Sequence, residues 1–322
     1  MKQLIILFCS ICFLCSCSKN EILTANRISL GIKTSEYTSR ASIDSLADLA
    51  LMGDRIGIYG VTDWAESPVM NNVRSTSVNP QTGAINWNGL YYYPLNTNLH
   101  FYSYYPFTST ATEGENYMEE RKGAAPLLHF TITGQEDLLY AQPVTGSNEI
   151  MPSPFVYEHL LTQFHFVLID EGNYRNTNIE QIVFTNVNTT STLHVQNGTL
   201  GEWSNPKSIL FPSSYPVRIT GTEENPQSIS GHLMLQPGME KYYISIKITN
   251  RGAYSNIRII PLGENTFAAG RSYEITLKFG IGDDGGTGDG GDDGGEVGVD
   301  IKATAWVTPW KNGGNGTGEV GE

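Results

Sequence analysis

Cysteine is nearly absent from this chain. The sequence of 322 residues contains four cysteines, and none follows Cys17. The body of the protein therefore has no disulfide and no cysteine nucleophile, and its stability has to come from burial of apolar surface. A chain of this length is long enough for that, and it suggests two domains of ordinary size. The four cysteines are Cys9, Cys12, Cys15 and Cys17.

Long apolar runs are also missing, apart from one at the start. The uncharged run from Leu4 to Leu14 follows Lys2. It is too short for a permanent span, which needs roughly 20 residues, and it suits the apolar core of a secretory signal, about 7–15 residues long. Leu14-Cys15-Ser16-Cys17 resembles the lipobox of bacterial lipoproteins, in which the signal is cut before a cysteine that then receives lipid. We therefore predict a signal peptide over residues 1–16 and lipidation, such as palmitate, on Cys17.

Basic charge is scarce. The chain carries 33 acidic against 20 basic side chains, a net charge of −13. Phosphate backbones require basic patches, and anionic lipid surfaces attract basic segments. The balance argues against nucleic acid and against broad electrostatic adhesion to membranes, and it fits a body exposed outside the cell.

Motifs for catalysis and cofactors are lacking too. We find no GxSxG elbow and no phosphate-loop or dinucleotide fingerprint, and nothing indicates a catalytic pair of carboxylates. The histidines show no metal-ligand spacing and are expected to be ordinary strand residues. We predict no enzymatic activity, no cofactor and no metal. The histidines are His100, His129, His159, His165, His194 and His232.

Short alternating segments dominate what is present. They recur every ~10–15 residues between Gly, Asn and Pro, with hardly any 3.6-residue period, which is typical of β-sandwiches. RISLGIKT predicts a strand with Ile28, Leu30 and Ile32 on one face. LHFYSYYPF has bulky residues on both faces and predicts a central strand. EQIVFTNV and STLHVQNG predict two further strands.

An aromatic block covers residues 87–105 and includes Trp87 and Tyr104. These residues alternate as strand residues do, so a core role is the favoured interpretation. Stacking against a sugar is the alternative, because aromatic side chains combine a large apolar face with a polar end.

Composition divides the chain further. Prolines near residue 152 mark a domain boundary. Residues 280–298 hold ten glycines and five aspartates. This stretch has too little apolar surface to offset the conformational entropy that ordering would cost. We interpret this stretch as a flexible linker with a reach of roughly 22–26 Å; calcium binding stays open, although no calcium-loop spacing repeats. The predicted domains are 17–152 and 153–279, followed by the linker 280–298 and a strand with tail at 299–322.

The order of several segments carries a family resemblance. The lipobox, RIGIYG, WNGLYYYP, LHFYSYYPF, EDLLYAQ, FVYEHLLTQFHFVL and AAGRSYEITLKF together resemble the fimbrillin-like proteins of Bacteroides-type bacteria, over nearly the whole chain. The resemblance implies two tandem transthyretin-like β-sandwich domains. It also implies an outer-membrane lipoprotein that acts in a pilus (fimbria) and in cell adhesion, as a shaft, tip or anchor subunit.

The resemblance further implies activation by an arginine-specific protease that cuts in a loop after the first strand. The matching loop is TSEYTSRAS, so Arg40-Ala41 is the predicted site and Arg27 the second choice. Cleavage would free the strand of Ile28, Leu30 and Ile32 and open a sheet edge to a strand from another subunit. Repeated donation has no closing symmetry and builds a filament.

The strand after the linker is the candidate donor. Its alternative role is to complete its own domain. Other subunits and, through Cys17, outer-membrane lipid are the expected partners. A second hypothesis is a lipoprotein that binds a glycan or host receptor and never polymerises. The candidate donor residues are Val299, Ile301, Ala303, Ala305 and Val307.

Overall fold

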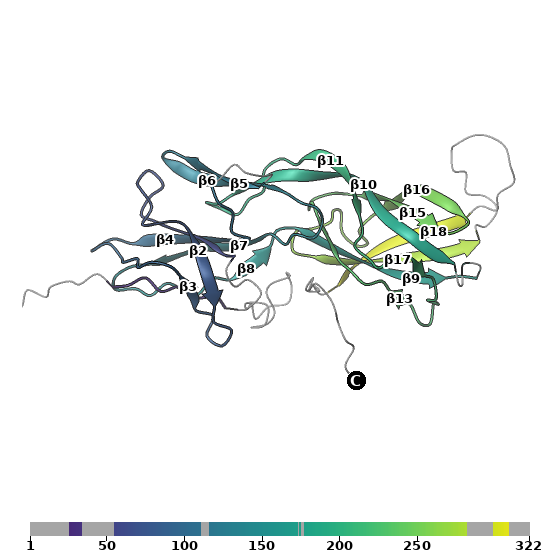
Figure 1. Cartoon of the computed structure of the whole chain (residues 1–322), viewed down its shortest axis with the longest axis horizontal. Coiled ribbons are helices and arrows are strands. Elements are labelled where there is room, and N and C mark those ends of the chain that lie inside the picture. Colours follow the sequence, from purple (N-terminus) through teal and green to yellow (C-terminus); the bar gives the residue numbers. More distant parts are fainter. Residues whose placement is uncertain are drawn as a thin grey trace, which may run out of the picture.

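The protein is an elongated β-structure whose strands form three sheets (Figure 1). A computed structural model describes residues 26–33, 55–110, 116–172, 174, 177–281 and 299–308. Within these residues every regular element is a β-strand, which confirms the all-β prediction. In the same part of the chain no helix has the length and apolar character needed to span a membrane.

The first sheet belongs to the N-terminal half and has six antiparallel strands in the order β3-β2-β1-β4-β7-β8. The strand β4 lies between β1 and β7, so the aromatic LHFYSYY stretch is central, as predicted. The strands are β1 (Gly57–Val61), β2 (Met70–Val78), β3 (Ile85–Trp87), β4 (Leu99–Tyr105), β7 (Leu139–Gly146) and β8 (Tyr157–His159).

Both faces of this sheet are covered. Successive side chains of a strand point to opposite faces, and in β1 Ile58 joins one buried cluster while Tyr59 joins another. The same division separates Phe101 from Tyr104 in β4. One face therefore packs toward the second sheet, and the other is left for the N-terminal residues 26–33.

The second sheet runs through both halves of the molecule. Its path is β16-β15-β10-β6-β5, and β11 and β12 also pair with β10. Its strands are β5 (Tyr117–Arg121), β6 (Ala124–Thr131), β10 (Asn178–His194), β11 (Ser204–Leu210), β12 (Val217–Arg218), β15 (Tyr242–Ile248) and β16 (Gly252–Ile259).

Strand β10 is unusually long, at 17 residues. Two separate strands were predicted here, but the structure joins them into one, which passes through Asn186 at a left-handed φ of 55° beside a β-bulge between Phe184 and Val187. Asparagine tolerates that conformation better than most residues. The first part of β10 pairs with β15, and its last five residues, Thr190–His194, pair with β6 of the N-terminal half.

The third sheet lies in the C-terminal half in the order β13-β9-β17-β18, with β14 also paired to β9. All pairings are antiparallel except β9 with β17. Its strands are β9 (Thr162–Asp170), β13 (Gln227–Ser228), β14 (Leu233–Leu235), β17 (Ser272–Ile281) and β18 (Val299–Thr308).

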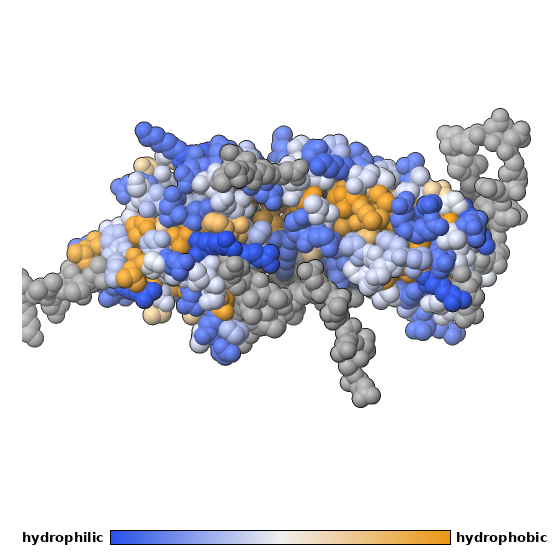
Figure 2. Space-filling view, viewed as in Figure 1, coloured by the Kyte–Doolittle hydropathy of each residue, from blue (hydrophilic) through white to orange (hydrophobic). Residues whose placement is uncertain are grey.

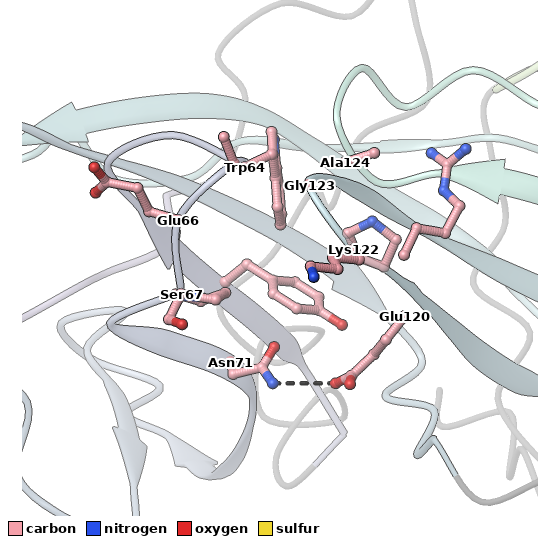
Figure 3. A pocket seen from close by; sticks show the side chains of 13 residues that line it. Trp64, Glu66, Ser67, Asn71, Glu120, Lys122, Gly123 and Ala124 are labelled. Atoms are coloured by element: carbon pink, nitrogen blue, oxygen red, sulfur yellow. Dashed lines mark hydrogen bonds between the residues drawn. The ribbon is translucent and has the colours of Figure 1, made fainter.

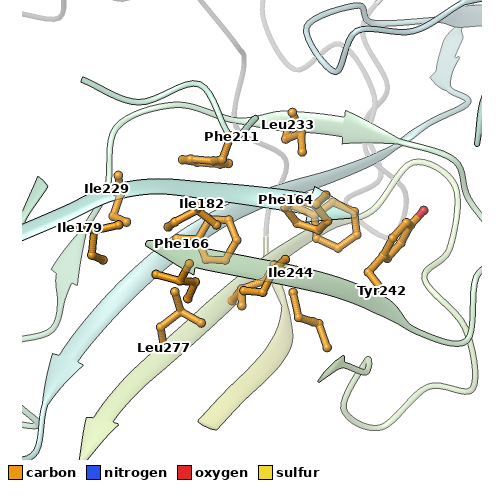
Figure 4. Close-up of a cluster of buried hydrophobic side chains, with 14 of the residues drawn as sticks. Phe164, Phe166, Ile179, Ile182, Phe211, Ile229, Leu233, Tyr242, Ile244 and Leu277 are labelled. Atoms are coloured by element: carbon orange, nitrogen blue, oxygen red, sulfur yellow. The ribbon is translucent and has the colours of Figure 1, made fainter. Parts of the chain in front are cut away.

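The C-terminal core lies between the second and third sheets (Figure 4). Phe164 of β9 is fully buried at its centre, and its ring centroid lies 5.4 Å from that of Phe184 and 5.1 Å from that of Phe267. Each such aromatic pair contributes about 0.5–1.5 kcal/mol beyond the area that it buries. Burial of this kind provides the stability that disulfides cannot give.

The predicted domain boundary at residue 152 lies close to residues that pack in the N-terminal half. The structure places Phe155 and Tyr157, which follow the predicted boundary at residue 152, in the buried cluster of the N-terminal half. The second sheet also crosses between the halves through β10. The division into 17–152 and 153–279 therefore stays a prediction.

Candidate functional site: the groove of the N-terminal segment

Residues 26–33, called here the N-terminal segment, lie in a groove of the N-terminal half. Ile28, Leu30 and Ile32 are 2%, 3% and 3% exposed, whereas the alternate residues Arg27 and Ser29 face solvent. This is the period of two that the sequence predicted. The three aliphatic side chains share one buried cluster with residues of the first sheet, including Ile58, Met70, Phe101 and Tyr157.

Backbone hydrogen bonds hold the segment along one edge. The amide of Ile28 donates to Tyr91 O at 2.9 Å, and Tyr93 N donates to Asn26 O at 3.0 Å. Further along, Ile32 N donates to Gly83 O at 2.9 Å, and Ile85 N donates to Leu30 O at 3.0 Å. The segment thus runs beside the chain that enters and follows β3.

The other edge pairs with Phe155. Phe155 N donates to Gly31 O at 2.8 Å, and Lys33 N donates to Phe155 O at 3.0 Å. At its start the segment is fixed by one residue, Asn148: Asn26 N donates to Asn148 Oδ1 at 2.5 Å, and Asn26 Nδ2 donates to Asn148 O at 2.7 Å. Polar contacts therefore set the register, and apolar contacts fill the groove.

Gly83 gives the segment room to approach. Its φ is +71°, and a Cβ built on it would lie 1.9 Å from Ile32 O. Only glycine combines that backbone conformation with so close a contact. The sequence shows Gly83 only as a turn signal in QTGA; its contact with Ile32 is non-local and leaves no pattern in the sequence.

The favourable and unfavourable free energies of docking the segment are of similar size. Burying three aliphatic side chains stabilises by about 5–9 kcal/mol, and the six backbone hydrogen bonds add about 3–9 kcal/mol. Ordering the backbone of residues 26–33 costs about 8–16 kcal/mol. These terms are of similar size, so the connection to the body, which keeps the segment at high effective concentration, contributes to its docking.

The predicted processing residues have different positions. Cys17, Arg40 and Ala41 lie outside the described residues. Arg27 is exposed, but it forms a β-bridge with Tyr92 inside the groove. A cut after Arg27 would leave Ile28 to Ile32 joined to the body, whereas a cut at residue 40 would separate the whole segment from it.

The candidate donor strand is β18. Residues Val299–Thr308 pair with β17 in ten consecutive antiparallel positions, from Ile281↔Val299 to Ser272↔Thr308. In this structure the strand is therefore part of its own sheet, which is the alternative role that the sequence left open. The structure does not describe the side chains of this strand, which include Ile301, Ala303, Ala305 and Val307. Donation of the strand to another subunit stays a prediction.

The aromatic block contributes to the core. Tyr104 has no exposed surface, and its hydroxyl donates to Asn72 Oδ1 at 2.6 Å. Trp87 packs partly buried against the cluster of the groove. Tyr104 therefore presents no face to a ligand, which agrees with the core interpretation.

Ionisable groups are dispersed. His159 lies 2.8 Å from Asp137, and His165 lies 3.2 Å from Glu274. Among the described residues no three His, Cys, Asp or Glu side chains are grouped so as to hold a metal ion. The groove itself is apolar and suited to holding a strand.

Comparison with known proteins identifies the family. A family model described as fimbrillin-like matches residues 40–310, so the chain belongs to the fimbrillin-like family. A search of curated proteins found no match.

Solved structures are similar to this chain over most of its length. A candidate cell adhesion protein from Bacteroides uniformis ATCC 8492 is 16% identical, with a TM-score of 0.57 over 87% of this chain and 98% of that chain. Another from Bacteroides ovatus ATCC 8483 is 12% identical, with a TM-score of 0.53 over 88% and 99%. The fimbrial anchor protein Mfa2 from Porphyromonas gingivalis is 11% identical, with a TM-score of 0.43 over 89% and 98%.

Family membership supports a structural role in pili and cell adhesion, in association with other subunits at the cell surface. How such a subunit would be held, processed and joined depends on the groove described above.

Proposed function

We propose that this protein is a subunit of a cell-surface pilus, exported as a lipoprotein and assembled by protease-triggered strand exchange. The observation that carries the proposal is the N-terminal segment, whose three aliphatic side chains are buried in a groove and whose backbone pairs along both edges. A segment of this kind stays in place while it is tethered and leaves when the tether is cut.

Membrane attachment precedes assembly in this proposal. Lipid on Cys17 holds the precursor at the outer membrane, since multiple acyl chains anchor stably where one does not. Cleavage at Arg40-Ala41 removes the lipid anchor and the N-terminal segment in one fragment. The groove then exposes the acceptors Gly83 O and Tyr91 O and the donors Ile85 N and Tyr93 N, the pattern of an unpaired sheet edge.

A strand from another subunit fills the vacated groove. The occupant that we favour is β18 with its preceding Gly/Asp stretch, which must first leave β17. The exposed apolar side chains around the Asn26 end of the groove support a subunit contact there, and hydrophobic residues gather at the left end of Figure 2. The exposed apolar residues in this part of the chain are Leu90, Tyr92, Leu95, Ile150 and Met151, which are 60%, 47%, 47%, 59% and 84% exposed.

The test is cleavage of the chain that begins at Ser18 by an arginine-specific protease. We expect a body whose first residue is Ala41, release of the N-terminal fragment, and a ladder of multimers on a native gel. Arg40→Lys keeps the charge but is not recognised, and should prevent both cleavage and the ladder. Arg55→Lys is the matched control and should change neither.

Two results would contradict the proposal in different places. A body that begins at residue 28 or 56 overturns the cleavage site, and a body that loses its fragment but stays monomeric overturns the assembly. The latter result would favour the second candidate, a lipoprotein that binds a ligand without polymerising. A chain ending at residue 298 should still be cut but form no ladder if β18 is the donor.

A further inference from the structure

A surface pocket lies at one end of the N-terminal half, away from the groove of the N-terminal segment. Its walls are the connection between β1 and β2 and the turn between β5 and β6 (Figure 3). Its volume is about 270 Å³, just below the range of about 300–1,000 Å³ typical of small-molecule sites. The pocket therefore suits one compact group rather than a peptide or an extended chain.

Aromatic rings form one wall. Trp64 lies edge-on to Tyr59 with ring centroids 5.5 Å apart, and its centroid lies 5.0 Å from that of Tyr102. Tyr59 is only 1% exposed, whereas Trp64 is half-buried. The rings are thus fixed by one another, and part of the indole remains accessible to a ligand.

Two polar atoms of this wall are unpaired. The Tyr59 hydroxyl and the Trp64 indole N–H are buried, and neither has a hydrogen-bond partner among the residues described. Buried polar groups are nearly always paired, so two unpaired ones in the lining of one pocket are candidates for hydrogen bonds to a ligand. Burial, with smaller contributions from Tyr104 and Glu120, raises the pKa of Tyr59, which keeps the phenol protonated and able to donate.

The rim is polar and has no net charge. Asn71 Nδ2 donates to Glu120 Oε1 at 3.0 Å, and Lys122 is exposed beside them. The Arg121 guanidinium is directed to Ala125 O, with Nε at 2.8 Å and Nη2 at 2.5 Å. Glu66 and Glu120 balance Arg121 and Lys122, so the lining favours a neutral ligand over a charged one.

We propose that this pocket binds a neutral pyranose unit of a glycan. A pyranose ring has an apolar C–H face for an aromatic wall and hydroxyls that both donate and accept. It can therefore pair with the Tyr59 hydroxyl and the Trp64 N–H while Asn71, Glu120 and Lys122 contact its other oxygens. The site does not depend on cleavage or polymerisation, because the uncut monomer carries it.

The experiment is saturation-transfer NMR of the uncut chain from Ser18 with a panel of neutral methyl pyranosides, followed by titration of the best ligand. At least one pyranoside should receive saturation. Tyr59→Phe removes one oxygen and should weaken binding at least tenfold. It should leave the melting temperature unchanged or higher, because it also removes an unpaired buried hydroxyl.

Tyr93→Phe is the matched control, since the Tyr93 hydroxyl is also buried without a described partner but lies in the groove cluster. It should not change the affinity, whereas Glu120→Gln, on the exposed rim, should reduce it. No saturation with any pyranoside, equal affinities for wild type and Tyr59→Phe, or binding of sugar acids alone would each overturn the proposal. Loss of multimer formation has no bearing on this assay.

Discussion

Leu30→Ala is the sharpest perturbation of the N-terminal segment. Leu30 lies in the middle of the segment and is 3% exposed. Truncating a buried leucine costs about 2–5 kcal/mol. Because the segment is held only marginally, we expect it to open locally while the rest of the N-terminal half stays folded.

The size of the effect follows from that cost. Each 1.4 kcal/mol is a factor of ten, so the opening equilibrium of the segment should shift roughly 30-fold to several thousand-fold in Leu30→Ala. Because this exceeds the small free energy that holds the segment, its amides should lose their protection from exchange with solvent. The amides to follow are Ile28 N, Ile32 N and Lys33 N, which donate to Tyr91 O, Gly83 O and Phe155 O. Hydrogen exchange read by mass spectrometry of the uncut chain measures the change.

Leu277→Ala provides the control. Leu277 has no exposed surface and lies in the C-terminal core, so its truncation should lower the melting temperature and leave exchange in the N-terminal segment unchanged. If Leu30→Ala lowers the melting temperature as Leu277→Ala does, with no selective exchange at residues 26–33, the segment is an integral strand and the reasoning about release is wrong.

Two further predictions concern backbone fit and pH. Gly83→Ala should undock the segment, because the added Cβ would meet Ile32 O. Gly123→Ala is the control: Gly123 also has a φ of +71°, but a Cβ there would have nothing within 4 Å, so this substitution introduces backbone strain without a clash. Proteolysis after Arg27 should accelerate only in the first, and equal rates would refute the role of Gly83. Burial also raises the pKa of Tyr215 from 10.0 to about 12. A raised native pKa gives stability that is complete below the unfolded value and falls as pH rises from about 10 toward 12, so the phenolate absorbance at 295 nm that comes from the buried tyrosines should appear together with alkaline unfolding. Phenolate absorbance that reaches the full value for all 17 tyrosines before unfolding would contradict the burial. Burial also raises the pKa of seven other tyrosines, namely Tyr59, Tyr93, Tyr104, Tyr140, Tyr157, Tyr242 and Tyr273.

Local alternation in the sequence predicts much of the strand content. LHFYSYY has bulky residues on both faces and is a central strand, and RISLGIKT alternates as the buried segment does. In these cases the pattern of one stretch records which of its faces are covered.

What the sequence could not predict depends on contacts between distant residues. Asn148 lies more than a hundred positions from Asn26, which it holds, and Phe155 pairs with Gly31 across a similar separation. The aromatic pocket was also missed, because Trp64 comes from a connection of the first sheet and Glu120 from β5 of the second sheet. The aromatic block of residues 87–105 attracted attention instead, although its abundance of rings reflects core packing.

The long strand β10 has a mechanical consequence. A fibre on a cell surface is pulled along its axis, and two halves joined only by a loop would separate at that loop first. Here the two halves of the molecule share strand β10. Its last five residues pair with β6, and these rungs of the ladder run from Thr190↔Thr131 to His194↔Leu127. Traction between the two halves is therefore transmitted along β10, and their separation requires these rungs to break.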